Sequence, residues 1–152
     1  MTMQVANVSC VAIGGRAIMI EGPPGSGKTS LALSLIDRGA QLVGDDGIEL
    51  TGSDGPPFAG PAPQISGKIE VRNVGIVELP TTRAPLALIL SLEDDAERYP
   101  LAIAERTVMG AAIPILKFRP GDAIQALRAE YALEKHGLPL RPSPSSGAKD
   151  KS

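Results

Sequence analysis

Eight consecutive residues at positions 22–29, Gly-Pro-Pro-Gly-Ser-Gly-Lys-Thr, match the phosphate-binding pattern G-x-x-x-x-G-K-[ST]. Glycines let the backbone wrap closely around a phosphate, and the start of a helix adds positive potential. Prolines cannot donate hydrogen bonds, so the amides from Gly25 to Thr29 must hold the anion. Lys28 can reach the β- and γ-phosphates, and the Thr29 hydroxyl can ligate Mg²⁺. We therefore predict a nucleoside triphosphate site. Its residues are Gly22, Pro23, Pro24, Gly25, Ser26, Gly27, Lys28, Thr29 and Ser30.

Two adjacent carboxylates, Asp45 and Asp46, follow a helix-like segment and the short apolar run Gln41–Gly44. A strand in this position commonly returns its carboxyl end to the phosphate edge of the sheet, which would place both aspartates near the γ-phosphate. Neighbours on a strand point in opposite directions. One aspartate can then face the reacting phosphate, as a base or to orient water, while the other braces the site or a metal-bound water. The alternative is an Asp-Asp-Gly turn with solvated carboxylates.

The elements that must position these groups are predicted from turn signals and periodicity. Val8–Ile13 and Ala17–Ile20 are strand-like runs separated by Gly14-Gly15-Arg16, which predicts a hairpin that leads directly into the glycines. An apolar stripe then predicts a helix that ends at Gly39. The stripe consists of Leu31, Ala32, Leu35 and Ile36.

Beyond the aspartates, residues 51–66 are rich in Gly and Pro and predict turns around short, irregular strands. Pro85–Leu92 and Ala111–Phe118 are apolar runs typical of buried strands, and the polar residues 93–100 predict a loop or short helix. Gly121–Gly137 predicts an amphipathic helix. Its apolar face is expected to consist of Ile124, Leu127 and Tyr131.

Together these elements predict the α/β class, with a mixed sheet and flanking helices. The length of 152 residues predicts one domain, which we place at residues 1–138, followed by a disordered tail at 139–152. A net charge of −2 argues against binding to nucleic acid or acidic membranes. No apolar run approaches a membrane span, so a cytoplasmic protein is expected. The single Cys10 is expected in the core, and His136 at the polar end of a helix.

Three segments resemble the HPr kinase/phosphorylases, bacterial enzymes that phosphorylate a serine of the phosphocarrier protein HPr. They are the predicted hairpin followed by GPPGSGKTSLALSLIDRGAQLVGDD, the segment EVRNVGIVEL at 70–79, and KFRPGDA at 117–123. The resemblance extends over about residues 4–136. It implies a P-loop kinase-type catalytic domain that uses ATP and Mg²⁺, with HPr as its partner in regulation of the sugar phosphotransferase system.

The resemblance also implies roles for individual residues. Asp46 matches the family's proton acceptor in phosphorylation, which is the proton donor in the reverse reaction. Thr29 and Glu70 match its Mg²⁺ ligands. Lys28 and Asp45 complete the predicted catalytic set, together with one arginine.

Arg98 is the best match to the family's catalytic arginine, which lies in a polar segment after a strand. Arg83 and Arg106 are weaker matches, and a surface charge is the ordinary alternative for Arg98. Arg72 and Arg119 match segments that are implicated in the family's mechanism.

Two features depart from the family pattern. Asn7 stands where the family has a catalytic histidine, and an asparagine cannot titrate near neutral pH, which argues against the reverse, phosphorylase activity. The chain also starts directly with the catalytic segment, as in short single-domain members, so regulation through an N-terminal domain is expected to be absent. The family's catalytic domains form hexamers, which suggests a homo-oligomer.

Two other functions are compatible with the glycine pattern. A small-molecule P-loop kinase would need lid arginines and a base pocket, and EVRNVGI argues against it. A non-catalytic ATP-binding sensor that acts on a signalling partner is favoured by Asn7.

Overall fold

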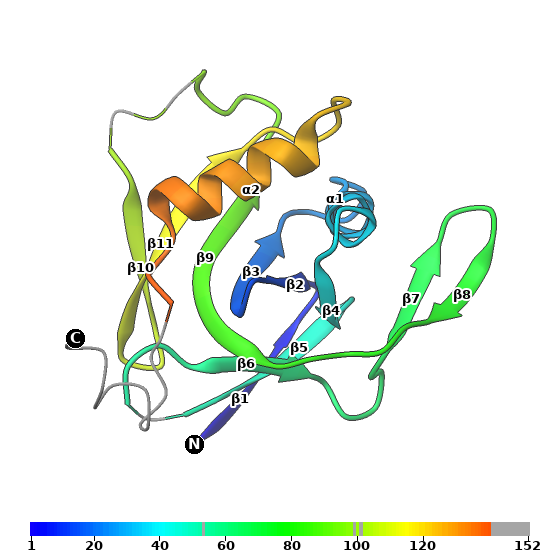
Figure 1. Cartoon of the computed structure of the whole chain (residues 1–152), viewed down its shortest axis with the longest axis horizontal. Helices are drawn as coiled ribbons and strands as arrows, with labels where there is room; N and C mark the ends of the chain where they lie inside the picture. The colour runs from blue at the N-terminus through cyan, green and yellow to red at the C-terminus, as the bar shows by residue number, and fades with distance from the viewer. Residues whose placement is uncertain (53, 99, 101, 141–152) are drawn as a thin grey trace.

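The computed structural model describes residues 1–52, 54–98, 100 and 102–140. Two helices and eleven strands are assigned within these residues (Figure 1). The strands are β1 (Thr2–Ala6), β2 (Ser9–Ile13), β3 (Arg16–Glu21), β4 (Gln41–Gly44), β5 (Gly47–Thr51), β6 (Phe58–Pro61), β7 (Lys68–Val71), β8 (Gly75–Glu78), β9 (Ala84–Leu92), β10 (Ala104–Val108) and β11 (Ala111–Phe118); the helices are α1 (Lys28–Asp37) and α2 (Gln125–His136).

One large mixed sheet organises the molecule. Its strands follow the order β1-β5-β6-β9-β3-β2-β4, and β11 pairs with β9 on one side and β10 on the other. Strand β9 is parallel to β3 and to β11, whereas β2 is antiparallel to both β3 and β4. The first residues of β9 pair instead with β6, and Figure 1 shows β9 curving strongly between the two parts of the sheet. The predicted mixed α/β sheet with flanking helices is confirmed.

Two apolar cores cover opposite faces of the central strands. Helices α1 and α2 pack on one face, where Leu31 and Leu35 meet Ile18 and Ile20 of β3 and Leu88 of β9. On the other face, the part of the sheet formed by β1, β5 and β6 folds back, so that its apolar residues contact β2, β3 and β9. Alternate residues of β3 therefore enter different cores, as strand geometry requires. The central strands are therefore packed against apolar side chains on both faces, and β3 leads directly into the loop before α1.

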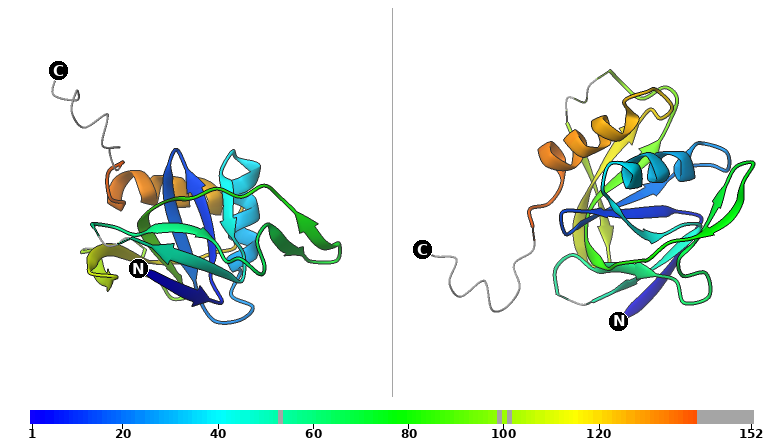
Figure 2. Two further views of the ribbon diagram at one scale, coloured as in Figure 1. Left: turned by 90° about the horizontal axis from the view of Figure 1, so that it is seen from below. Right: turned by 45° about the vertical axis from the view of Figure 1, so that its right-hand side comes forward.

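The antiparallel pair β7–β8 forms a separate small sheet. It projects from the main body in Figure 1 and in both views of Figure 2. Val74 and Ile76 near its tip are 72% and 63% exposed, although isolated hairpins seldom leave large apolar side chains in water. The hairpin contacts α1 through β7.

Several predicted elements are confirmed, with small shifts at their ends. The hairpin Val8–Ile13 with Ala17–Ile20 corresponds to β2 and β3, and β4 and β11 have the predicted bounds. Cys10 is fully buried, as expected, and His136 is the last residue of α2. The tail predicted at 139–152 lies, from residue 141 on, outside the described residues.

The predicted apolar face of the second helix is wrong. Ile124 is the N-cap and 53% exposed, and Tyr131 is 62% exposed. The buried side of α2 instead consists of three alanines with Leu133 and the polar Gln125, because this is the side that packs against α1 and β9. The buried residues are Gln125, Ala126, Ala129, Ala132 and Leu133.

Five strands, β1, β5, β7, β8 and β10, are absent from the sequence-based prediction. Strands β1 and β10 each pair on one side only and consist mainly of exposed residues, so their sequences carry little apolar alternation. Strand β5 is short and starts with Gly47. These strands are defined by their partners rather than by their own composition.

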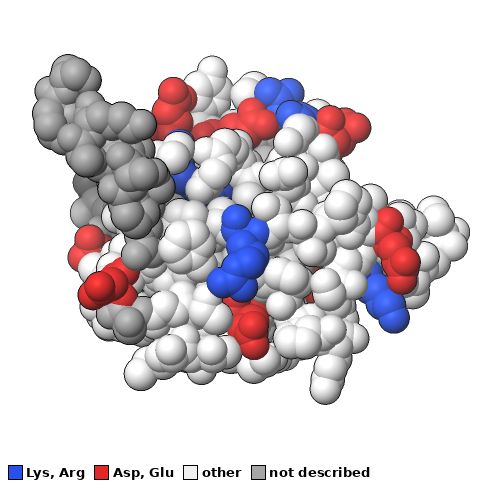
Figure 3. All heavy atoms as spheres, turned by 60° about the horizontal axis from the view of Figure 1, so that its bottom comes forward, with Lys and Arg blue, Asp and Glu red and all other residues white. Residues whose placement is uncertain are grey.

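Charged side chains are distributed without a dominant sign on the face drawn in Figure 3. On that face, the described Lys and Arg residues lie singly or beside Asp and Glu. Within the described residues, neither helix is long and apolar enough to span a membrane.

Candidate functional site

The glycine loop, residues 22–29, connects the end of β3 to the start of α1. Gly25 and Gly27 have φ angles of 79° and 105°, a region that side-chain-bearing residues rarely adopt. Gly22 is needed for another reason: a Cβ atom there would lie 2.6 Å from the Ser26 hydroxyl and 3.1 Å from Leu92. The loop can therefore fold tightly only with these glycines.

Lys28 closes the loop from inside. Its Nζ donates to the carbonyl oxygens of Gly22 and Pro23, at 2.8 and 3.2 Å. Lys28 is also the first residue of α1, and the amides at a helix start have no carbonyl partner within the helix. Free amides and an ammonium group thus converge on the same loop, an arrangement that attracts anions.

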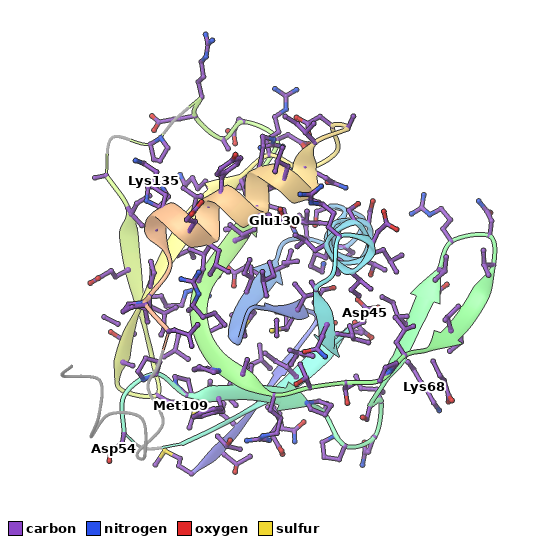
Figure 4. The ribbon with its side chains drawn as sticks, in the orientation of Figure 1. Asp45, Asp54, Lys68, Met109, Glu130 and Lys135 are labelled. Carbon is purple, nitrogen blue, oxygen red and sulfur yellow. The ribbon has the colours of Figure 1, made fainter. Side chains whose placement is uncertain are left out.

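Asp45 is bound directly to the glycine loop. Its carboxylate is buried, and its Oδ1 accepts hydrogen bonds from the Thr29 hydroxyl at 3.0 Å and the Ser9 hydroxyl at 2.7 Å. Figure 4 shows Asp45 beyond the end of β4, close to α1. Three separate segments, β2, α1 and the β4–β5 turn, therefore meet at one carboxylate oxygen.

Asp46 lies beside Asp45 but in different surroundings. Both residues form the turn between β4 and β5, not the end of a strand as predicted, because a Cβ on Gly44 would lie 2.5 Å from the Gly47 carbonyl and the chain reverses sharply there. Asp46 is exposed and has a φ of 65°. Its backbone carbonyl accepts a hydrogen bond from the backbone N–H of Asn7 at 3.2 Å.

Asp46 also lines a cavity of about 390 Å³, which we call the Asp46 cavity. The cavity lies between β1, the β4–β5 turn and residues 62–65. Its other lining residues are Gln4, Val5, Ala6, Gly47, Ala62, Pro63, Gln64 and Ile65. The turn thus separates the two aspartates: one carboxylate is fixed inside the protein, and the other borders an accessible space.

Glu70 lies on β7, and its side chain is exposed. The hairpin touches α1 through β7, but no hydrogen bond links Glu70 to Thr29. Among the described residues, no three His, Cys, Asp or Glu side chains gather closely enough to hold a metal ion by themselves. This is compatible with Mg²⁺, which usually takes one or two carboxylates and completes its shell with phosphates and water.

The candidate arginines are spread over three places. Arg98 is exposed in the segment after β9, and Arg83 donates to the Thr51 hydroxyl at 2.6 Å, on the β5–β6 side. Arg106 of β10 forms two hydrogen bonds of 2.7 Å with Glu21, the residue directly before Gly22. Glu21 accordingly raises the pKa of the Arg106 guanidinium. Arg106 is the candidate whose side chain is anchored next to the glycine loop.

A turn at residues 119–121 borders the other flank of the loop. A Cβ on Gly27 would lie 3.7 Å from Pro120, an ordinary packing distance. The buried Gln125 holds this turn, because its Oε1 accepts from the Gly121 amide at 2.8 Å and its Nε2 donates to the Ser34 hydroxyl at 3.1 Å. The KFRPGDA segment is thereby tied to α1.

A larger cavity, of about 950 Å³, begins at this turn; we call it the α2 cavity. It lies between α2, the end of β11 and the segment after β9, and Lys135, labelled in Figure 4, belongs to its wall near the C-terminal end of α2. Its described lining residues are Ala96, Glu97, Arg98, Pro100, Leu116, Lys117, Phe118, Arg119, Pro120, Gly121, Asp122, Arg128, Tyr131, Ala132, Lys135 and His136.

Three residues that hold the site together are missing from the sequence-based set. Ser9, Glu21 and Gln125 contact Asp45, Arg106 and the 119–121 turn respectively. Ser9 is the first residue of β2, and Glu21 is the last residue of β3. A polar residue at the end of an apolar strand is only a weak indication of a role in the site. Gln125 is the first residue of α2 and carries no such signal.

The mixed sheet, the two helices on one face and the glycine loop between β3 and α1 define an α/β protein with a glycine-rich loop at the start of a helix. A sequence profile of the HPr Serine kinase C-terminal domain matches residues 2–83, more than half of the chain. The chain therefore belongs to the HPr serine kinase C-terminal domain family.

Curated proteins with similar sequences carry the name of this family. The chain is 30% identical over 148 residues to an HPr kinase/phosphorylase of Exiguobacterium sp., which covers 84% of this chain and 48% of the relative. A second relative, the HPr kinase/phosphorylase of Bordetella pertussis, is 34% identical over 117 residues, covering 68% and 37%. The chain thus spans about half the length, or less, of these curated relatives.

A solved structure shares the fold. The Hpr(Ser) kinase/phosphatase from Coxiella burnetii superposes with a TM-score of 0.75 at 24% sequence identity, covering 88% of this chain and 95% of that one. At this identity the match supports the fold alone.

Proposed function

We propose that the chain is an ATP-dependent serine kinase that acts in the cytoplasm on an HPr-like phosphocarrier protein. The observation that carries the proposal is the contact between the Thr29 hydroxyl and the buried Asp45, which puts a potential metal ligand and a carboxylate at the end of the glycine loop. The family and its HPr kinase/phosphorylase relatives support the reaction type and the acceptor.

The phosphates of ATP are held by the glycine loop, here acting as a P-loop. The amides of the first turn of α1 bind the phosphate oxygens, and Lys28 exchanges its two carbonyl partners for the β- and γ-phosphates. The exchange costs little, because the carbonyl bonds are partly exposed and the new partner is charged. Through these two carbonyl bonds, Lys28 also holds the loop in its folded shape.

Thr29 and Glu70 would hold Mg²⁺, which would neutralise charge on the phosphates of the nucleotide. Thr29 supplies a hydroxyl ligand, and Asp45 orients that hydroxyl or a metal-bound water through its 3.0 Å contact. Glu70 is the second protein ligand in this proposal. Glu70 is exposed on β7, which contacts α1, so it would hold the metal from the side of the hairpin.

Asp46 is the base. As the serine oxygen attacks the γ-phosphorus and the bond to ADP breaks, the Asp46 carboxylate takes the hydroxyl proton. Its exposure and its cavity leave room for an acceptor protein. Arg98 stays our proposed catalytic arginine by resemblance, while the anchoring of Arg106 beside Gly22 favours Arg106 as the alternative.

The test is incubation of the purified chain with γ-labelled ATP, Mg²⁺ and the HPr of the same organism. Transfer of label to one serine of HPr is the expected result. A protein that binds ATP but labels no acceptor would instead be a nucleotide sensor, the function that Asn7 favours because the family histidine is missing there. Transfer to small molecules alone would identify a small-molecule kinase.

A further inference from the structure

We propose that the α2 cavity holds the base and ribose of the nucleotide. This inference rests on the proposed function, since it assumes that the glycine loop binds the phosphates of ATP. The glycine pattern at residues 22–29 predicts where the phosphates bind, but it does not say where the base and ribose bind.

The direction in which the nucleotide lies follows from the elements on either side of the glycine loop. Thr29 and Asp45 mark the flank where metal and terminal phosphate belong, on the side of β4. In the sheet order, β2 and β4 lie on one side of β3, and β9 and β11 lie on the other. A triphosphate whose terminal phosphate is at Asp45 therefore extends its nucleoside toward the ends of β9 and β11.

The α2 cavity opens at that place. Strands β3, β9 and β11 are parallel, and ligands of open α/β sheets bind in the crevice beyond the carboxyl ends of such strands. The turn at 119–121 forms both the near wall of the cavity and the packing partner of Gly27. A ligand can thus pass from the loop into the cavity along one continuous wall.

That wall is rigidly connected to the phosphate end. Gln125 joins the Gly121 amide to Ser34, and the Ser34 hydroxyl donates to the carbonyl of Ser30 at 2.9 Å. Ser30 lies in the first turn of α1. The cavity wall and the phosphate-binding turn therefore keep a fixed spacing, which a ligand bound at both ends requires.

The lining suits a nucleoside next to phosphates. Leu116, Pro100 and the ring of Tyr131 offer apolar surface, and Tyr131 is 62% exposed although it is aromatic. Arg119 lies in the wall nearest the loop, and Lys117 and Lys135 add positive charge. A cavity of about 950 Å³ is within the usual size of small-ligand sites, which reaches about 1,000 Å³.

The Asp46 cavity is the rival site. It is smaller, about 390 Å³, and it borders the carboxylate that must reach the acceptor hydroxyl. A nucleoside there would occupy the space that the acceptor needs. The two cavities thus have different roles, and labelling can tell them apart.

The first experiment is photolabelling of the intact chain with 8-azido-ATP, which carries its reactive azide on the base, followed by peptide mapping. Labelled peptides from residues 116–136 are the expected result. Label on residues 1–6 or 62–65, the walls of the Asp46 cavity, or anywhere else outside 93–136, would overturn the proposal.

The second experiment compares Tyr131→Ala with Glu134→Ala, an exposed residue of α2 outside the cavity, by calorimetric titration with ATP and with inorganic triphosphate. Tyr131→Ala should weaken ATP binding about tenfold, as expected for one base–aromatic stack, and leave triphosphate binding unchanged. Glu134→Ala should change neither. Unchanged ATP binding in Tyr131→Ala, or equal losses for both ligands, would contradict the inference alone. A wild-type chain that binds neither ligand would overturn the proposed function as well.

Discussion

The Asp45 region and the β7–β8 hairpin carry the two halves of one proposed metal site, and they differ in every physical respect. Asp45 is buried and accepts two hydrogen bonds from other segments, so its position is fixed before any ligand arrives. Glu70 is exposed on a hairpin that projects from the body and leaves Val74 and Ile76 in water (Figure 2).

This difference suggests separate roles for the two regions in the proposed function. The groups that would bind phosphates in the proposed function are preorganised by the core, because any movement there would weaken several hydrogen bonds at once. A ligand on a hairpin can approach after the nucleotide and the acceptor have entered. Changes in the first region should therefore alter binding, base chemistry and stability, whereas changes in the hairpin should alter metal dependence.

The largest effect is expected from Lys28→Ala. Lys28 would neutralise the transferred phosphate and, without ligand, closes the loop onto Gly22 and Pro23. Phosphoryl transfer should fall by about 10³–10⁵-fold, the range for an arginine finger, which likewise stabilises charge on a transferred phosphoryl group. The measurement is label transfer from ATP, with circular dichroism to show that the variant is folded. Near-normal transfer would reject the role of the glycine loop.

Asp46→Asn should have the next largest effect. The amide keeps the shape of the exposed turn but cannot accept the serine proton, so transfer should drop by about 10²–10⁴ while ATP binding persists. Rates of transfer and calorimetric affinities measure the two quantities separately. Full transfer by the variant would show that another group is the base.

Glu70→Gln tests the hairpin, with Glu78→Gln as its matched control on β8. If Glu70 is a ligand, the Mg²⁺ concentration for half-maximal activity should rise by at least ~10–100-fold, the cost of losing even an outer-shell partner. Glu78→Gln should leave it unchanged, and neither variant should lower the melting temperature appreciably, since both side chains are exposed. Superimposable Mg²⁺ titrations would remove Glu70 from the metal site.

Asp45→Asn should act mainly on stability. The amide oxygen can still accept from the Ser9 and Thr29 hydroxyls, but it carries no charge, so both hydrogen bonds weaken at a total cost of about 1–3 kcal/mol. Denaturant unfolding measures this loss, and Asp46→Asn is the control because Asp46 is exposed. Equal stabilities of the two variants would contradict the contrast between the neighbouring aspartates.

Asn7→His should have the smallest effect on the kinase reaction. Asn7 has a φ of 64°, and histidine, like asparagine, is enriched in this conformation, so the backbone should accept the change. A titratable group next to Asp46 should raise dephosphorylation of phospho-HPr more than it raises phosphorylation. Both directions must be measured in the same preparation. A gain confined to the forward reaction would argue against a role for this position in the reverse one.

The sequence by itself determined the features that depend on local spacing. The pattern at 22–29 requires glycines at positions with positive φ, and the strand–loop–helix order around it follows from apolar periodicity. Strands β4, β9 and β11 were predictable because their sequences are mainly apolar. The family was predictable because three separated segments resemble its pattern together.

Only the tertiary structure decided which aspartate is fixed and which is accessible. The turn between Gly44 and Gly47 directs Asp45 to Thr29 and Asp46 outward, and both depend on a chain reversal that adjacent identical residues cannot reveal. The pairing of Arg106 with Glu21 joins residues 85 positions apart in the chain, and the hydrogen bond from Gln125 to Ser34 joins residues 91 positions apart. They arise when separate elements pack together, so no local pattern encodes them.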